Sequence, residues 1–143
     1  MELYTLQPNL PEIPEHLILK DPELIRKIPD NFPYPNPTYS THDVSPVLRI
    51  WLQKHFDFKF YVNYQVMYRQ LPIHIDIDRE VCYNYIIDTG GDNVKTRWYD
   101  DSQTTEIHSV VVPERVWHKL DVSKPHDISE VSRPRFSITV WPA

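Results

Sequence analysis

Alternation of side-chain character is the feature that most constrains the fold of this chain. Between residues 58 and 68, aromatic or aliphatic residues occupy every second position, and mostly polar residues stand between them. The alternating positions are Phe58, Phe60, Val62, Tyr64, Val66 and Tyr68. Because successive side chains of an extended chain point to opposite faces of a sheet, this period predicts a long strand with one apolar face.

Shorter segments of strand-like composition follow this first strand. Expected strands span about residues 72–77, 80–88, 94–100, 105–112, 115–121 and 134–141, and a polar loop spans about 122–133. Turn-forming segments, such as Thr89-Gly-Gly-Asp92, separate several of these strands. Many short strands with short connections predict a mainly-β protein, either a sandwich or a double-sheet jelly roll.

The N-terminal flank has a different composition, because nine of the 14 prolines lie in the first 46 residues. Proline has no backbone N–H, so it neither continues a helix nor pairs within a central strand. We therefore expect residues 1–41 to form a Pro-rich arm that packs on the domain, with one short helix near residues 22–28. Residues 42–143 are expected to form the domain itself.

A single longer helix is expected at the start of this domain. Ser45 is a favourable N-cap residue, and the proline that follows it suits the first turn of a helix. Apolar residues gather on one side of this helix, which predicts an apolar stripe against the core. One face holds Val47, Ile50, Trp51 and Lys54, and Leu48, Leu52 and His55 adjoin it. The helix is expected to end near Phe56.

Length, charge and cysteine content narrow the class of protein. A chain of 143 residues fits one domain. The net charge of -5, with no basic run, argues against a nucleic-acid partner. The chain shows neither a signal-peptide pattern nor an apolar run of about 20 residues, so no membrane partner is expected. Cys82 is the single cysteine, so no disulfide forms within the chain, which favours a reducing, cytoplasmic setting. The sequence does not indicate an oligomeric state.

A candidate metal motif lies in the short segment from residue 71 to residue 79. His74 and Asp76 stand two positions apart on an expected strand, so their side chains point the same way. An imidazole and a carboxylate side by side, joined by a second histidine from another strand, form the ligand set of non-haem Fe(II) oxygenases. We expect His118 to be the third ligand, with His108 as its alternative. The remaining histidines, expected to be solvated in the arm, the helix or a loop, are His16, His42, His55 and His126.

A candidate anion site lies on the last expected strand. Arg135 and Ser137 are two positions apart and share one face of that strand. The planar guanidinium binds a carboxylate through two parallel hydrogen bonds, which an ammonium group does not do, and the serine hydroxyl adds a further donor. Arg133 and Arg97 remain alternatives for the cationic anchor. Further candidates to line this pocket, by strand parity, are Tyr64, Tyr68 and Asn84.

Taken in order, these motifs resemble the Fe(II)/2-oxoglutarate-dependent dioxygenase superfamily, in particular its small aspartyl/asparaginyl hydroxylase-like and phage-type members. The resemblance covers about residues 58–141 and implies a double-stranded β-helix, the jelly-roll or cupin-like fold. In that superfamily the His-x-Asp pair ends the second core strand, the distal histidine lies on the seventh and the arginine on the eighth. The interval from His118 to Arg135 is longer than the superfamily has.

The resemblance implies a hydroxylase that uses Fe(II), dioxygen and 2-oxoglutarate as its cosubstrate. His74, Asp76 and His118 would hold the metal, and Arg135 with Ser137 would bind the cosubstrate. The substrate would be a small molecule, an amino acid or a peptide. Two alternatives remain open: a cupin-like metalloprotein that does not use 2-oxoglutarate, and a non-catalytic β-sandwich binding module.

Overall fold

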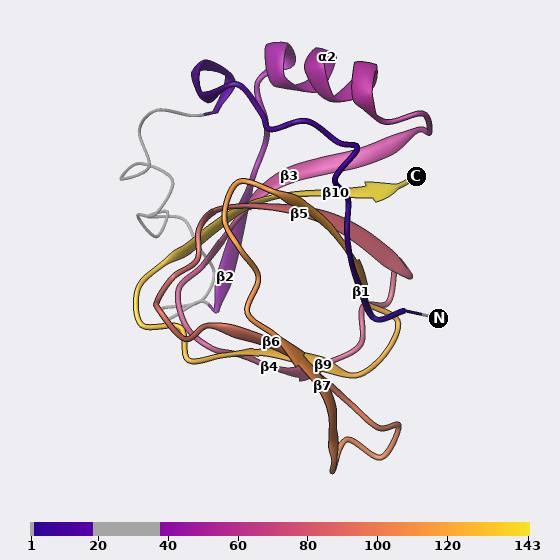
Figure 1. Ribbon diagram of the computed structural model, residues 1–143, viewed down its shortest axis with the longest axis vertical. Helices are drawn as coiled ribbons and strands as arrows, with labels where there is room; N and C mark the ends of the chain where they lie inside the picture. The colour runs from indigo at the N-terminus through magenta and orange to yellow at the C-terminus, as the bar shows by residue number, and fades with distance from the viewer. Residues whose placement is uncertain (1, 19–37) are drawn as a thin grey trace.

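Two antiparallel sheets face each other in the computed structural model, which describes residues 2–18 and 38–143 (Figure 1). The short helix expected near residues 22–28 lies outside the described residues. The larger sheet has six strands and the smaller sheet has four. The expectation of a mainly-β protein is therefore confirmed, in the form of a β-sandwich.

The larger sheet has the strand order β1-β8-β5-β10-β3-β2. Its strands are β1 (Tyr4–Leu6), β2 (Tyr39–His42), β3 (Phe60–Met67), β5 (Val81–Asp88), β8 (Trp117–Asp121) and β10 (Arg135–Pro142). The smaller sheet has the order β4-β9-β6-β7. Its strands are β4 (Leu71–His74), β6 (Lys95–Tyr99), β7 (Glu106–Val110) and β9 (His126–Ser129). From β3 onward the chain therefore crosses repeatedly between the two sheets.

Every segment that the sequence predicts as a strand contains one in the structure, but the segment 122–133 was wrongly expected to be only a loop. Within it, β9 pairs with β4 on one side and with β6 on the other. Three of its four residues are buried, although its sequence His-Asp-Ile-Ser is mostly polar. Pairing on both edges therefore gives this strand a stability that its own composition does not indicate.

The helix α2 (Pro46–His55) covers the outer face of the larger sheet (Figure 1). As predicted, the Ser45 hydroxyl caps it, accepting a hydrogen bond from the Leu48 N–H at 3.2 Å. The face that meets the sheet was predicted only in part. The buried side chains are Leu48 and Leu52, which were expected beside the stripe, whereas Val47 and Ile50, which were expected within it, are exposed. Residues four apart lie on one line along a helix, and this line is shifted by one position from the expected stripe.

The outer face of the larger sheet carries the main apolar core. The helix meets an aromatic and aliphatic layer whose sheet members are Val62, Tyr64, Val66, Tyr85, Trp117, Phe136, Ile138 and Val140. The N-terminal segment covers the same layer: β1 pairs with β8, and Ile13 and Ile18 are buried in this cluster. The Trp117 indole donates a hydrogen bond to the Pro11 carbonyl at 3.0 Å, which ties this segment to the sheet.

The inner face of the larger sheet, which looks toward the smaller sheet, is largely polar. The alternate residues of β3 on this face are Asn63, Gln65 and Met67, and those of β10 begin with Arg135, Ser137 and Thr139. A smaller apolar cluster, formed by Cys82, Trp98, Leu120 and Val122, fills one end of the interior. One sheet thus separates an apolar outer core from a polar interior, and the interior is where the candidate site lies.

Two side chains of equal size on α2, one buried and one exposed, test which face of the helix packs on the larger sheet. Leu52 is fully buried against the outer core and Ile50 is 54% exposed. We expect Leu52→Ala to lower the free energy of unfolding by about 2–5 kcal/mol, because it leaves a cavity under the helix. The matched control Ile50→Ala should change it by less than about 1 kcal/mol. Urea unfolding of both variants measures the difference, and equal losses would contradict the observed orientation of α2.

Candidate metal centre

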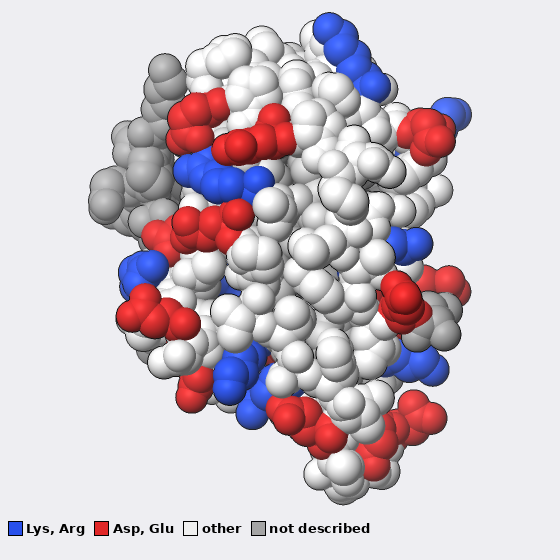
Figure 2. Space-filling model, in the orientation of Figure 1, with Lys and Arg blue, Asp and Glu red and all other residues white. Residues whose placement is uncertain are grey.

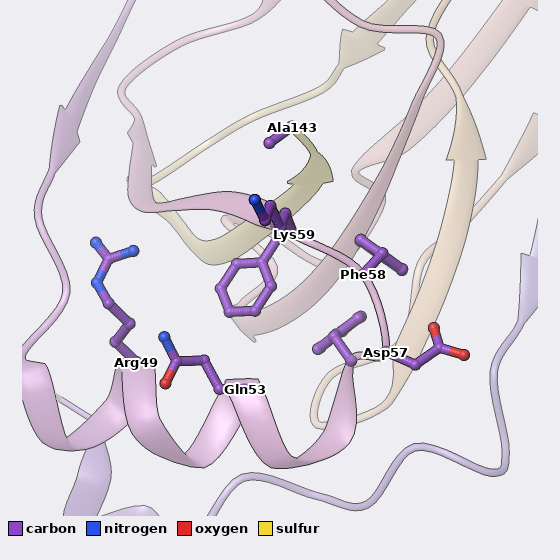
Figure 3. A pocket seen from close by; sticks show the side chains of 8 residues that line it. Arg49, Gln53, Asp57, Phe58, Lys59 and Ala143 are labelled. Atoms are coloured by element: carbon purple, nitrogen blue, oxygen red, sulfur yellow. The ribbon is translucent and has the colours of Figure 1, made fainter.

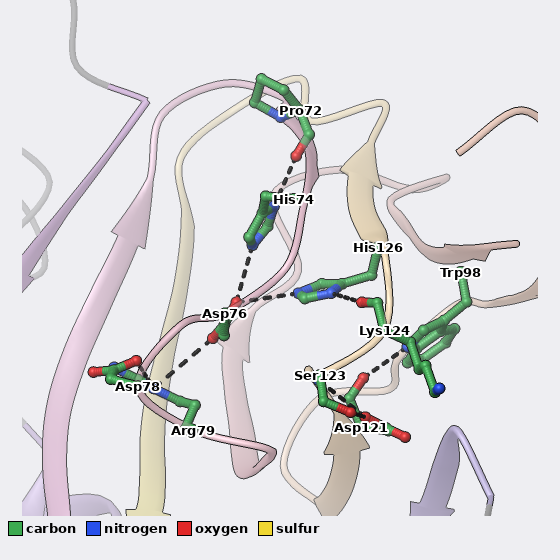
Figure 4. A network of polar contacts seen from close by, with 10 residues as sticks. All are labelled: Pro72, His74, Asp76, Asp78, Arg79, Trp98, Asp121, Ser123, Lys124 and His126. Carbon is green, nitrogen blue, oxygen red and sulfur yellow. Dashed lines mark hydrogen bonds and ion pairs between the residues drawn. The ribbon is translucent and has the colours of Figure 1, made fainter. Parts of the chain in front are cut away.

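Three ligand-type side chains converge where β4 and β9 pair (Figure 4). His74 ends β4, His126 begins β9, and the two residues stand directly opposite each other in the antiparallel register. Asp76 follows in the loop after β4. One ligand atom from each residue lies within 4.8 Å of the others, and this is the one such group found among the described residues.

The carboxylate of Asp76 sits between the two imidazole rings. Its Oδ1 lies 3.2 Å from His74 Nε2 and 3.5 Å from His126 Nε2. The ring centroids of the two histidines are 4.3 Å apart. Two imidazole nitrogens and one carboxylate oxygen therefore face a common point, and the group can hold a metal ion.

Backbone carbonyl groups orient both imidazole rings. His74 Nδ1 lies 2.8 Å from the Pro72 carbonyl oxygen, and His126 Nδ1 lies 2.7 Å from that of Lys124. Because a carbonyl oxygen only accepts, each Nδ1 carries the hydrogen, and in the neutral ring the lone pair is on Nε2. Hydrogen bonds of this kind fix the tautomer and the ring plane of metal-binding histidines.

Arg79 holds the other oxygen of the Asp76 carboxylate. Its Nε lies 3.8 Å from Asp76 Oδ2, and the guanidinium stacks 3.6 Å from the centre of the Trp141 ring. Arg79 also makes two hydrogen bonds to the exposed Asp78 carboxylate. The Asp76 N–H donates to the Val122 carbonyl at 3.0 Å. These contacts leave Oδ1 as the oxygen that faces the two histidines.

Electrostatics distinguish the two histidines. The hydrogen bond to the Asp76 carboxylate, with smaller contributions, raises the pKa of His74 above its usual value. Burial lowers the pKa of His126, whose side chain is almost fully covered. The neutral imidazole that a metal requires is therefore favoured at His126, whereas at His74 a metal displaces a proton that Asp76 helps to retain.

The histidine that completes this group is His126 and not the predicted His118. His118 lies on β8 in the other sheet, opposite Asn84, and is fully buried. His108, the alternative, is exposed on β7 beside Trp98. The expectation that His126 is solvated is wrong, because this residue is only 6% exposed.

One signal in the sequence could have identified His126. It precedes Arg135 by nine positions, which removes the overlong interval that His118 leaves. We missed it because the polar segment that contains it was interpreted as a loop. Strand pairing across the smaller sheet, and not local composition, brings His126 to His74.

A hollow of about 590 Å³ opens beside this group and is lined by two of its members, His74 and Asp76. Its walls come from β2, β3, β10 and the segment from β4 to Arg79, and the lining residues include Tyr39, Thr41, Asn63, Gln65, His74, Asp76 and Thr139. A second hollow, of about 630 Å³, lies between α2 and the start of β3 (Figure 3). It is lined by Arg49, Gln53, Phe56, Asp57, Phe58, Lys59, Phe60 and Ala143, with no histidine among them. The first hollow is therefore the one with metal-binding chemistry.

Of the three candidate arginine anchors, Arg135 alone lacks an acidic partner within the described residues. Arg97 makes two hydrogen bonds to Asp127, at 2.9 and 2.6 Å, and Arg133 lies 3.1 Å from Asp88. Arg135 is only 4% exposed, and burial lowers its pKa to about 10. A buried guanidinium without a counter-ion is costly, which marks Arg135 as a site for an anion.

Backbone packing fixes the start of the Arg135 side chain. Gly90 adopts a φ of +83°, and a Cβ added there would lie 2.7 Å from Arg135 Cβ. Ser137 is buried on the same face of β10, between Ile86 and Gln65 in register. The predicted pair of Arg135 and Ser137 is thus held on the polar inner face.

Two of the predicted pocket residues point the other way. Tyr64 is fully buried in the outer core, where its ring stacks on Phe136 with centroids 5.3 Å apart. The Tyr68 hydroxyl lies 2.8 Å from the Ser40 hydroxyl, and its ring packs against the same core. The prediction had the parity of β3 reversed, since Asn63 and Gln65 line the hollow. Asn84 stands opposite Thr139 in register, on the inner face, but it is not among the residues that line the hollow.

Comparison with known proteins adds no relative from which a function could be carried over. No protein-family model matches the sequence, and no curated protein is significantly similar to it. On the face drawn in Figure 2, acidic and basic side chains are interspersed near the edges and form no continuous basic area. In the part of the chain that the structure describes, no helix is long and apolar enough to cross a membrane.

Metal titration distinguishes the two candidate third ligands. Loss of a group that hydrogen-bonds to a metal ligand typically weakens metal binding by roughly 10–100-fold. His126 is itself a candidate ligand, so we expect His126→Ala to weaken Mn(II) or Zn(II) binding by more than this. The control His108→Ala removes an exposed imidazole of the same sheet and should leave the affinity unchanged. Isothermal titration calorimetry measures both. Equal affinities of the His126→Ala and wild-type proteins would contradict the metal centre.

The pH dependence of stability tests the state of His118. In the folded protein burial, with a contribution from Arg135, lowers its pKa from 6.5 to about 3. Between these two values the unfolded chain binds a proton that the folded protein does not, so the free energy of unfolding falls as the pH falls. His118→Leu should flatten this slope by at most about 1.4 kcal/mol per pH unit. Urea unfolding across this pH range measures it, and unchanged slopes would contradict a buried neutral His118.

Proposed function

We propose that this chain is an Fe(II)- and 2-oxoglutarate-dependent oxygenase, a hydroxylase built on a double-stranded β-helix. The observation that carries the proposal is the convergence of His74, Asp76 and His126, of which His74 and Asp76 line an open hollow. The facing larger sheet carries Arg135, which is buried and has no acidic partner among the described residues.

Strand order supports the fold. If β3 is counted as the first core strand, the larger sheet holds the first, third, sixth and eighth strands, and the smaller sheet holds the others. The superfamily that the sequence resembles has His-x-Asp at the end of the second strand, a histidine on the seventh and an arginine on the eighth. In this chain those places are the end of β4, the start of β9 and the start of β10.

The ligand set supports Fe(II). Two imidazole nitrogens and one carboxylate oxygen on one side of a metal leave coordination positions open on the other, which is the arrangement of non-haem Fe(II) oxygenases. The hollow beside the group gives room for ligands at those positions. When bound, Fe(II) and 2-oxoglutarate supply the activation of dioxygen and the oxidation of the substrate. The role of the chain is to hold the metal, bind the cosubstrate and admit the substrate.

Arg135 and Ser137 support a dicarboxylate cosubstrate. The guanidinium is buried, charged and without an acidic partner among the described residues. A carboxylate of the cosubstrate would neutralise its charge and accept its N–H hydrogen bonds. The Ser137 hydroxyl, on the same strand face, adds a donor. Arg97 and Arg133 are already paired with Asp127 and Asp88, which leaves Arg135 as the anchor.

The alternatives explain less of this geometry. A non-catalytic β-sandwich gives no reason for two histidines to direct Nε2 toward one carboxylate oxygen. A cupin-like metalloprotein that does not use 2-oxoglutarate explains the metal ligands but not the buried Arg135. The substrate that we propose is a small molecule, an amino acid or a peptide, since it must enter the hollow beside the metal.

Succinate formation tests the activity. Each turnover converts one 2-oxoglutarate and one dioxygen into succinate and carbon dioxide, while one oxygen atom enters the substrate. We expect wild-type protein, purified without oxygen and loaded with Fe(II), to form succinate when a panel of amino acids and peptides is added in air. Asp76→Ala should abolish it and His108→Ala should retain it. Wild-type succinate no higher than that of Asp76→Ala would move the assignment to a non-catalytic sandwich.

Arg135 gives an independent prediction about the cosubstrate. Arg135→Lys keeps the charge but loses the paired donors, so we expect 2-oxoglutarate affinity to fall by about tenfold or more with metal affinity unchanged. The control is Arg133→Lys, two positions away and half exposed. Calorimetric titration of the Mn(II)-loaded proteins measures both. If 2-oxoglutarate binds equally well to the Arg135→Lys protein, this residue is not the anchor.

A further inference from the structure

Exposed apolar side chains border the hollow beside the candidate metal centre. Ile77 is fully exposed, Ile75 is 46% exposed and Tyr39 is 45% exposed, and all three line the hollow. Ile75 and Ile77 stand on either side of Asp76 in the chain. Single apolar residues are common on protein surfaces, but several of them around one hollow mark a place where an apolar ligand binds. We call Tyr39, Ile75 and Ile77 the apolar rim.

Neutral hydrogen-bonding side chains line the more covered part of the same hollow. Asn63 and Gln65 on β3 are half-buried, and Thr139 on β10 is only 4% exposed. A side-chain amide both donates and accepts hydrogen bonds, and so does a hydroxyl. A peptide group has one donor and one acceptor, so these side chains can pair with both of its polar atoms.

Each charged side chain among the described residues that line the hollow already faces an opposite charge (Figure 4). Arg79 donates two hydrogen bonds to Asp78, both at 3.0 Å, and its Nε lies 3.8 Å from Asp76 Oδ2. An ionised group that leaves water without a counter-ion is strongly disfavoured. A free amino acid brings both an ammonium and a carboxylate group, for which these lining residues offer no unengaged partner. The hollow therefore favours an uncharged ligand.

Two edge strands border the hollow. In the described part of the chain, β2 is the last strand of the larger sheet, β4 is the last strand of the smaller sheet, and both contribute lining residues. No further strand of that part closes this side, so a ligand longer than one residue can lie across the opening. The volume of about 590 Å³ also falls within the roughly 300–1,000 Å³ of ligand pockets.

We propose that the substrate of this site is an uncharged amide that carries an apolar side chain, as an internal residue of a peptide does. The apolar side chain contacts the apolar rim, and the adjoining amide pairs with Asn63 and Gln65. Free amino acids and acidic residues are thereby excluded as substrates. This inference rests on the proposed function, because it names the substrate class of the same site.

Four small probes separate charge from apolar character. N-acetyl-leucinamide is uncharged and apolar, N-acetyl-asparaginamide is uncharged and polar, N-acetyl-aspartic acid α-amide carries a carboxylate, and free leucine carries two charges. The side chains of the four probes have nearly the same size. Broadening of the NMR signals of each probe by Mn(II)-loaded protein, relative to Zn(II)-loaded protein, measures binding close to the metal. We expect N-acetyl-leucinamide to bind about tenfold more tightly than each of the others.

Variants of the apolar rim test where the probe binds. Ile77→Ser and Tyr39→Ser remove apolar surface from opposite walls of the hollow, and we expect each to weaken N-acetyl-leucinamide binding by about threefold or more. Affinity for Mn(II) should not change. The control Ile107→Ser removes the same side chain as Ile77→Ser from β7, where it is 55% exposed and lines no part of this hollow. Equal affinity of wild-type protein and both rim variants for N-acetyl-leucinamide would overturn the inference.

Succinate formation with the same probes distinguishes this inference from the proposed function. If both rim variants weaken N-acetyl-leucinamide binding but wild-type protein forms no succinate with any probe, the binding class is supported and the oxygenase assignment is not. If succinate forms with free leucine or with the aspartic acid α-amide and not with N-acetyl-leucinamide, the oxygenase assignment stands and the inference fails. If Mn(II)-loaded protein broadens the signals of none of the probes, the inference fails whatever the succinate assay gives.

Discussion

The antiparallel pairing of β4 with β9 is the constraint on which the site depends. It sets His74 directly opposite His126, and the loop that follows β4 returns Asp76 between the two rings. The carbonyl group two residues before each histidine fixes its ring, so ligand geometry follows from backbone structure and not from side-chain packing alone. A shift of one residue in this register would turn one histidine to the opposite face of the sheet. The geometry of the candidate metal centre therefore depends on the pairing of two short strands.

The two faces of the larger sheet differ: the outer face packs the apolar core that stabilises the fold, and the inner face carries the candidate binding residues. Its outer face buries aromatic and aliphatic side chains against α2 and the N-terminal segment, whereas its inner face carries a buried cation and several unpaired polar atoms. An interior of this kind lowers stability, and proteins commonly accept such a loss where a ligand is bound. The arrangement also explains the low pKa of His118, because burial and the nearby guanidinium both disfavour its charged form.

Local patterns were enough to predict much of this structure. The strand segments and the Ser45 cap follow from periodicity and residue type, which act over a few neighbouring residues. His74 and Asp76 do come together, but β4 ends at His74, so Asp76 lies in the loop and not on the expected strand. The face of β3 that lines the hollow was not predictable from alternation, because Tyr64 suits either an apolar core or a pocket. His126 was missed because β9 is short and polar, and its conformation is set by pairing with β4 and β6. That Arg135 lacks an acidic partner, unlike Arg97 and Arg133, is a tertiary property that sequence spacing does not contain.

The position of a bound metal tests the central claim most directly. A crystal grown without oxygen in the presence of Fe(II), with diffraction data collected on both sides of the iron absorption edge, locates the ion independently of any assumed ligands. The account predicts one anomalous peak, with His74 Nε2, Asp76 Oδ1 and His126 Nε2 at about 2.0–2.2 Å, the range of nitrogen and oxygen ligands to a first-row metal. A peak coordinated by His118, or no peak between β4 and β9 at full Fe(II) loading, would contradict it.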